Sequence, residues 1–117
     1  MSFETLQAAG SALGTGAVIV MDETTDMVEV ARRITSFFVH ESCGGCTPCR
    51  AGGEQLLRTL ETVASGRGTS RDLTKLEELT RGITGVTFCP MGTGMCEPVS
   101  SGLARFRQEF AARISAN

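Results

Sequence analysis

The sequence contains no tryptophan or tyrosine, and its 117 residues include a single histidine. It also lacks a basic stripe, because its 11 lysines and arginines are scattered and are outnumbered by 13 acidic residues. This charge pattern argues against nucleic-acid binding. The longest apolar run, from Ala17 to Met21, is too short to span a bilayer. We also expect no signal peptide at Met1, because a charged start followed by an apolar stretch is missing.

The size and the odd number of cysteines set further bounds. A chain of 117 residues forms one small domain with a modest core, here of aliphatic and phenylalanine side chains. Five cysteines cannot form a complete disulfide framework within one chain. Together with the expected lack of a signal peptide, they indicate a reducing compartment, where clustered cysteines bind metal. We therefore expect a cytoplasmic location.

Four of the five cysteines lie in two places. Cys43, Cys46 and Cys49 form the string Cys-Gly-Gly-Cys-Thr-Pro-Cys-Arg, and Cys89 follows 40 residues after the third. Three cysteines spaced two residues apart, with a distant fourth, are typical of an iron–sulfur ligand set. The spacing therefore predicts a 4Fe-4S cluster that passes electrons, with these four cysteines as its ligands.

Other interpretations of the cysteines stay open at this point. A structural zinc site also uses four cysteines, although its ligands usually come as two pairs. Cys46 and Cys49 could form a redox dithiol, but no alternation of strands and helices surrounds them. Cys96 is interpreted as a small, semi-buried apolar side chain, and it is the substitute if Cys89 is not the fourth ligand. His40 is expected to end a helix rather than bind metal.

Residues beside the cysteines predict how the cluster is accommodated. Gly44 and Gly45 allow the backbone to approach the cluster closely, and their N–H groups are expected to donate to its sulfurs. Arg50 places a cation beside an anionic cluster, which favours the reduced form. Pro48 indicates a helix start, so Cys49 lies in a first turn, where the helix dipole favours a thiolate. Ser42 is expected only to hydrogen-bond near the cluster.

Periodic apolar residues predict four helices with short connections. The first spans roughly 25–40. The predicted starts are Thr24 or Thr25, Thr47-Pro48, Ser70, and Glu97-Pro98. The predicted buried faces are Met27, Val30, Ala31, Ile34, Phe37 and Phe38; then Leu56, Leu57, Leu60 and Val63; then Leu73, Leu76, Leu79 and Ile83; and last Val99, Leu103, Phe106, Phe110 and Ile114.

These helices predict a mainly α fold, a small four-helix bundle that carries the iron–sulfur cluster at one end. Residues 1–24 are expected to be a short N-terminal extended segment, and residues 25–117 the helical 4Fe-4S cluster-binding domain. Within the segment, the glycines of residues 1–16 indicate a loop, and Val18 to Val20 predicts one short strand. A lone strand would pair with something outside the chain or lie extended against the helices.

Several stretches resemble one protein family. They are residues 10–22, residues 40–50 with the string His-Glu-Ser-Cys-Gly-Gly-Cys-Thr-Pro-Cys-Arg, the Cys89 loop, and residues 98–110. The chain is similar to the C-terminal part of the NADH-oxidising flavoprotein subunit of respiratory complex I. It also resembles the beta subunits of NAD-linked formate dehydrogenases and the diaphorase subunits of NAD(P)-reducing hydrogenases. The resemblance implies the end of a ubiquitin-like region (residues 1–24), followed by a helical iron–sulfur domain.

The same resemblance implies a cofactor set. It implies that Cys43, Cys46, Cys49 and Cys89 hold a 4Fe-4S cluster, in agreement with the spacing. The cluster would take single electrons from FMN reduced by NADH, and Pro90 with the next residue, Met91, would lie in the loop that faces the flavin. That loop departs from the family, which tends to have a small apolar stretch with alanines there, whereas this chain has Pro-Met-Gly-Thr-Gly-Met-Cys.

The resemblance also implies partners. FMN and NAD would be held by a preceding domain or by a partner subunit, so we do not expect the isolated chain to be catalytic. Further implied partners are a 2Fe-2S thioredoxin-like subunit and a catalytic dehydrogenase or hydrogenase subunit. The implied place is the cytoplasm, including the cytoplasmic face of a membrane complex. The alternative hypothesis is a non-redox interaction module, whose structural metal site holds a bundle that docks partner subunits.

Overall fold

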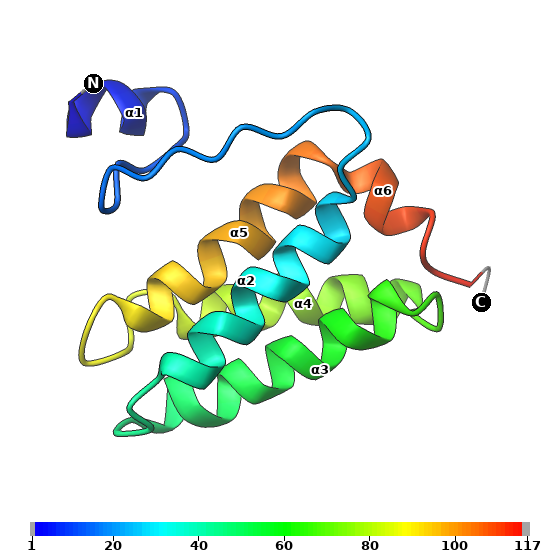
Figure 1. The fold of residues 1–117 in the computed structure, drawn as a ribbon. Coiled ribbons are helices and arrows are strands. Elements are labelled where there is room, and N and C mark those ends of the chain that lie inside the picture. Colours follow the sequence, from blue (N-terminus) through cyan, green and yellow to red (C-terminus); the bar gives the residue numbers. More distant parts are fainter. Residues whose placement is uncertain (1, 116–117) are drawn as a thin grey trace.

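Four long helices form the body of the protein, and the computed structural model describes residues 2–115. Each long helix contacts two of the others: α2 packs on α3 and α5, and α4 packs on the same two helices from the other side (Figure 1). The predicted mainly helical class is confirmed, and no strand forms within residues 2–115. In chain order the elements are α1 (Phe3–Ala8), α2 (Met27–Glu41), η1 (Pro48–Gly52), α3 (Gly53–Ala64), α4 (Ser70–Ile83), α5 (Met91–Arg105) and α6 (Arg107–Ala111).

Helix α2 has the predicted extent, but its cap and its buried face differ from the prediction. The carboxylate of Asp26, and not Thr24 or Thr25, accepts hydrogen bonds from the first backbone N–H groups of the helix. Ala31 is buried and Phe38 packs against the core, as predicted. The other fully buried residues are Val28 and Thr35, whereas Phe37 is 60% exposed. The small side chains lie inside because α2 is packed between α3 and α5, where close neighbours leave little room for large ones.

The second predicted helix starts where expected but opens with a π-helical turn. Thr47-Pro48 leads into η1, which continues directly into α3. Leu56, Leu60 and Val63 are buried as predicted, and Leu57 is only half-buried. An added Cβ at Gly52 would lie 2.9 Å from Ile83 Cδ1 of α4. This glycine therefore lets η1 approach α4 closely.

Helix α4 begins at Ser70, which was the predicted cap, so the cap is the preceding residue, Thr69. The backbone N–H and the hydroxyl of Thr69, and not Ser70, bond to the Asp72 carboxylate, each at 2.8 Å. The bond from the backbone N–H of the cap to the side chain of the third helical residue is one half of a capping box. Leu73, Leu76 and Ile83 are buried as predicted.

The predicted start of the last long helix is wrong. Helix α5 begins at Met91, so that Pro98 lies inside it. The glycines at 92 and 94 suggested a loop, but both are helical and allow close packing. An added Cβ would lie 2.4 Å from Thr87 Cγ2 at Gly92 and 3.2 Å from the Phe38 ring at Gly94. Val99, Leu103 and Phe110 are buried as predicted, while Phe106, the residue after the end of α5, is 38% exposed.

The N-terminal segment contains a helix that the sequence pattern did not predict. Ser2 caps the short helix α1, and the chain then runs along the outside of the bundle (Figure 1). The Arg105 guanidinium of α5 donates to the backbone oxygens of Ala9 and Gly10, at 3.1 and 3.2 Å. The predicted strand at Val18–Val20 is absent, and these side chains are 70–90% exposed. A single β-branched run lacks the partner that a strand requires.

No helix within residues 2–115 is both long enough and apolar enough to cross a membrane.

Candidate metal centre

The two cysteine-bearing loops lie at the same end of the bundle. Residues 42–47 connect α2 to η1, and residues 84–90 connect α4 to α5; both loops leave the helices on the same side (Figure 1). The turn η1 also contacts α4 and α5 directly. The antiparallel course of the helices thus brings together two segments that are 40 residues apart in the sequence.

The four predicted ligands differ in exposure. Cys49, in the first turn of η1, is buried and 6% exposed; Cys46 is half-buried; Cys43 and Cys89 are exposed. Within residues 2–115, no three histidine, cysteine or acidic side chains gather closely enough to hold one metal ion. The structure therefore places the two loops at one end without joining the four sulfurs around one point. The ligand set stays a prediction.

Gly45 and its surroundings fit a bulky inorganic group. The Gly45 N–H donates to the Cys43 sulfur at 3.4 Å, as predicted for a backbone donor to a ligand sulfur. A Cβ on Gly45 would lie 3.3 Å from that sulfur, which is tight for a non-bonded contact. A glycine here therefore keeps the space beside Cys43 free.

The neighbouring glycine does something different from what was predicted. The Gly44 N–H donates to the Ser42 hydroxyl oxygen at 3.3 Å, and not to a sulfur. The Gly44 carbonyl accepts a hydrogen bond of 2.6 Å from the Arg50 guanidinium. Arg50 thus closes the loop onto itself, a contact that the sequence could not reveal.

Ser42 directly contacts the sulfur of one predicted ligand, which its position in the sequence does not indicate. Its hydroxyl oxygen lies 3.2 Å from the Cys49 sulfur, although seven residues separate the two positions. The only signal in the sequence is a hydroxyl directly before the first cysteine. Its partner could be identified only once the chain had turned from α2 into η1.

Cys96 lies on α5 and is 1% exposed. Burial raises the pKa of the Cys96 thiol; a hydrogen bond with Thr84 opposes this shift, and the charge of Cys49 adds to it. Cys96 and Cys49 belong to one apolar core cluster. Cys96 therefore sits in the core beneath the cysteine loop, with a thiol that resists ionisation.

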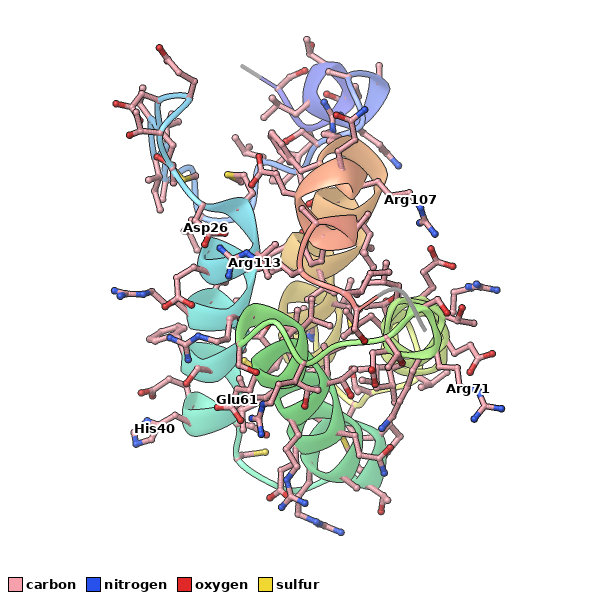
Figure 2. The ribbon with its side chains drawn as sticks, turned by 90° about the vertical axis from the view of Figure 1, so that its right-hand side faces the viewer. Asp26, His40, Glu61, Arg71, Arg107 and Arg113 are labelled. Atoms are coloured by element: carbon pink, nitrogen blue, oxygen red, sulfur yellow. The ribbon has the colours of Figure 1, made fainter. Side chains whose placement is uncertain are left out.

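The remaining predicted residues lie around this end of the bundle. His40 points away from the bundle (Figure 2), and its Nδ1 lies within hydrogen-bond distance of the Glu41 carboxylate, 3.1 Å from Oε1. Pro90 is exposed, and Met91 is half-buried and packs against the core. Phe88, next to Cys89, is 91% exposed. This loop therefore presents an apolar side chain to solvent beside a predicted ligand.

Comparison with known proteins gives a consistent picture. Residues 29–113 match the family model described as the NADH-ubiquinone oxidoreductase-F iron-sulfur binding region. The chain is 47% identical over 114 residues to the F 2 subunit of the NADH-quinone oxidoreductase of Rhizobium meliloti (strain 1021), covering 97% of this chain and 27% of that protein. It is 44% identical over 114 residues to the corresponding F subunit of Mycobacterium tuberculosis (strain ATCC 25618 / H37Rv), covering 97% and 26%.

A solved structure shares the fold. The NAD+-reducing [NiFe]-hydrogenase in the H2-reduced state superposes with a TM-score of 0.82 and 35% identity, covering 87% of this chain and 18% of that one. The chain spans about a quarter of the length of the curated relatives it matches. The matches confirm the predicted iron–sulfur binding region.

Proposed function

The chain belongs to the family of the NADH-ubiquinone oxidoreductase-F iron-sulfur binding region, and on that premise we propose that it is an electron-transfer domain. Its task would be to relay electrons from a flavin to further iron–sulfur clusters in an NADH-linked complex. The observation that carries this proposal is the placement of both cysteine-bearing loops at one end of the bundle. When bound there, a 4Fe-4S cluster supplies a one-electron redox centre.

Four cysteines of this chain would hold the cluster. Cys43 and Cys46 come from the loop after α2, Cys49 from the first turn of η1, and Cys89 from the loop before α5. The donor set fits, because thiolates are the usual ligands of iron–sulfur clusters. Cys96 would stay a core side chain, because it is 1% exposed and lies on α5 rather than in either cysteine-bearing loop or in η1.

The surrounding residues would shape the site rather than react. Cys49 is part of the apolar core, and Cys46 and Met91 pack against it, which keeps water from the inner side of the site. The hydrogen bond from Arg50 to Gly44 holds the loop that carries the first two cysteines. A loop fixed in this way limits how far the ligands move between redox states, which favours fast electron transfer.

The proposal extends to the electron donor and to the partners. The relatives are F subunits of NADH-quinone oxidoreductases, and the structural neighbour is an NAD+-reducing hydrogenase. We therefore propose NADH-reduced FMN, held by a preceding domain or a partner subunit, as the donor. A 2Fe-2S thioredoxin-like subunit and a dehydrogenase or hydrogenase subunit would be further partners, in the cytoplasm or on the cytoplasmic face of a membrane complex.

A non-redox docking module is the second candidate function. Its supporting observation is the exposure of large apolar side chains in the N-terminal segment, where Val20 is 90% exposed, and at Phe88, which is 91% exposed. Contiguous exposed apolar residues often mark contact surfaces. In that case the metal would be a structural zinc ion that staples the loops.

A redox experiment separates the two candidates. The chain is purified without oxygen, its iron, sulfide and zinc are measured, and it is then mixed with photoreduced FMN or dithionite and examined by low-temperature EPR. The relay predicts a reversible signal of a reduced 4Fe-4S cluster, which disappears on reoxidation. A chain that holds stoichiometric zinc and gives no signal would instead support the docking module.

A further inference from the structure

The hydroxyl of Ser42 is placed against one particular sulfur. Ser42 follows the last residue of α2, and Cys49 lies in the first turn of η1, yet Oγ and Sγ are 3.2 Å apart. Cys49 is 6% exposed, so bulk water competes little for this contact. A hydrogen bond in such a partly dry place is electrostatically stronger than the same bond in water.

The direction of this hydrogen bond follows from the other partner of Ser42. A serine hydroxyl has one proton to donate and two lone pairs to accept with. The Gly44 N–H donates to Ser42 Oγ at 3.3 Å, which occupies one lone pair and leaves the proton free. A cysteine that ligates a metal is a thiolate without a proton. In the cluster-bound chain the hydroxyl would therefore be the donor and the Cys49 sulfur the acceptor.

Arg50 and Gly44 hold the serine in this arrangement. The Arg50 guanidinium bonds the Gly44 carbonyl at 2.6 Å, while the N–H of the same glycine bonds the serine. Gly44 has a φ of 70°, a backbone conformation that glycine adopts at little cost. Three contacts thus run from Arg50 through Gly44 and Ser42 back to Cys49, the residue next to Arg50.

We propose that Ser42 is a positioning residue that raises the reduction potential of the cluster through a hydrogen bond to the Cys49 sulfur. The inference rests on the proposed function, because it requires the cluster to be present. Reduction adds an electron, and part of that charge lies on the ligand sulfurs. A hydrogen-bond donor stabilises the more negative form more strongly. Loss of the hydroxyl therefore makes the cluster harder to reduce.

The test compares Ser42→Ala with Ser42→Thr, which keeps a hydroxyl. Thr47→Val is the matched control, because the exposed Thr47 hydroxyl lies in the same loop and makes no capping hydrogen bond. Iron and sulfide are counted first, and the midpoint potential is then measured by potentiometric titration with EPR detection. At the wild-type midpoint, Ser42→Ala should lower the ratio of reduced to oxidised cluster roughly tenfold, about 59 mV for one electron. Ser42→Thr and Thr47→Val should stay near the wild-type value.

Each failure has its own signature. If the wild-type chain holds no iron–sulfur cluster, the proposed function fails and the inference fails with it. If the wild-type chain binds the cluster but Ser42→Ala keeps the wild-type midpoint potential, only the inference is overturned. The same holds if the midpoint potential of Ser42→Ala falls no further than that of Thr47→Val. Should Ser42→Ala not retain iron, electron–nuclear double resonance of the reduced wild-type and Ser42→Thr chains in H2O and D2O decides. Two strongly coupled exchangeable protons, one from the Ser42 hydroxyl and one from the Gly45 N–H that donates to the Cys43 sulfur, support the inference. A single one overturns it.

Discussion

Asp26 and Arg113 lie 87 residues apart in the sequence and form an ion pair between the start of α2 and the end of the described chain. Figure 2 shows the two side chains pointing toward each other. The other oxygen of the Asp26 carboxylate accepts hydrogen bonds from the backbone N–H groups of Val28 and Glu29, at 3.0 and 3.2 Å. Arg113 also donates to the Ala64 carbonyl at 2.7 Å, at the end of α3. One arginine therefore ties two helix ends and the C-terminal segment together.

We expect Arg113→Met to lower the free energy of unfolding by about 1 kcal/mol. A half-exposed ion pair contributes less than that by itself, but the substitution also leaves the Ala64 carbonyl without its donor. Urea denaturation followed by circular dichroism measures the change. Arg71→Met is the control, because Arg71 is exposed, points into solvent in Figure 2, and forms no ion pair within residues 2–115. Equal losses in both variants would contradict this role for Arg113.

The fourth ligand can be assigned by two single substitutions. Cys89→Ser should abolish the cluster without unfolding the protein, because Cys89 is exposed. Cys96→Ala should leave the iron content unchanged, because Cys96 is a buried thiol whose pKa is raised by burial. Iron and sulfide analysis of each purified variant provides the measurement. The opposite pattern, iron lost with Cys96 and kept without Cys89, would make Cys96 the ligand.

Two glycines, one exposed in α4 and one buried in the connection between α3 and α4, should respond to alanine in opposite directions. Gly82 lies in α4, and an added Cβ meets nothing within 4 Å. Gly82→Ala should stabilise the chain by about 0.5–1 kcal/mol, since alanine loses less backbone entropy in a helix. At Gly68 the Cβ would lie 3.0 Å from the Val63 Cα, a backbone atom that cannot move aside easily. Gly68→Ala should therefore destabilise by about 1–3 kcal/mol.

Thermal denaturation of both glycine variants alongside the wild type tests this pair. The melting temperature should rise for Gly82→Ala and fall for Gly68→Ala. Shifts of the same sign in the two variants would contradict the claim that the room for an added Cβ decides how the melting temperature changes.

Glu29 should make the free energy of unfolding depend on pH in the acidic range. Hydrogen bonds from Arg32, and then from Arg33, lower the pKa of Glu29 from its ordinary 4.5 to about 2. The unfolded chain therefore binds this proton at a higher pH than the folded chain does. The stabilising contribution is complete above about 4.5 and is lost as the pH falls from there toward about 2.

Glu29→Gln should accordingly flatten the fall of the unfolding free energy across that acidic window. Urea denaturation at a series of pH values measures the slope. Glu78→Gln serves as the control, because Glu78 is exposed and pairs with no cation within residues 2–115. An unchanged slope in Glu29→Gln would rule out this contribution.

The sequence predicts the parts of the fold that depend on local signals. The extents of α2 and α4 follow from apolar periodicity, and Thr47-Pro48 marks the start of η1 because proline suits a first turn. The start of α5 is not predicted, because Glu97-Pro98 indicates a helix start whereas Pro98 lies inside the helix. The buried face of α2 is predicted only in part, because its two neighbouring helices also bury Val28 and Thr35.

The candidate site shows the same division. Cysteine spacing indicates the ligand type without any structure, and the resemblance identifies the family that the match over residues 29–113 then confirms. The contact between Ser42 and Cys49, and the one between Arg50 and Gly44, depend on how the loop folds back. No pattern in the sequence contains that information. Side-chain contacts within irregular loops therefore had to come from the structure.

The metal content of the chain tests the central claim most directly. The full chain is purified without oxygen after expression with iron, and its iron, acid-labile sulfide and zinc are measured per polypeptide. The account predicts about four iron and about four sulfide per chain. One zinc per chain, with neither iron nor sulfide, would contradict it.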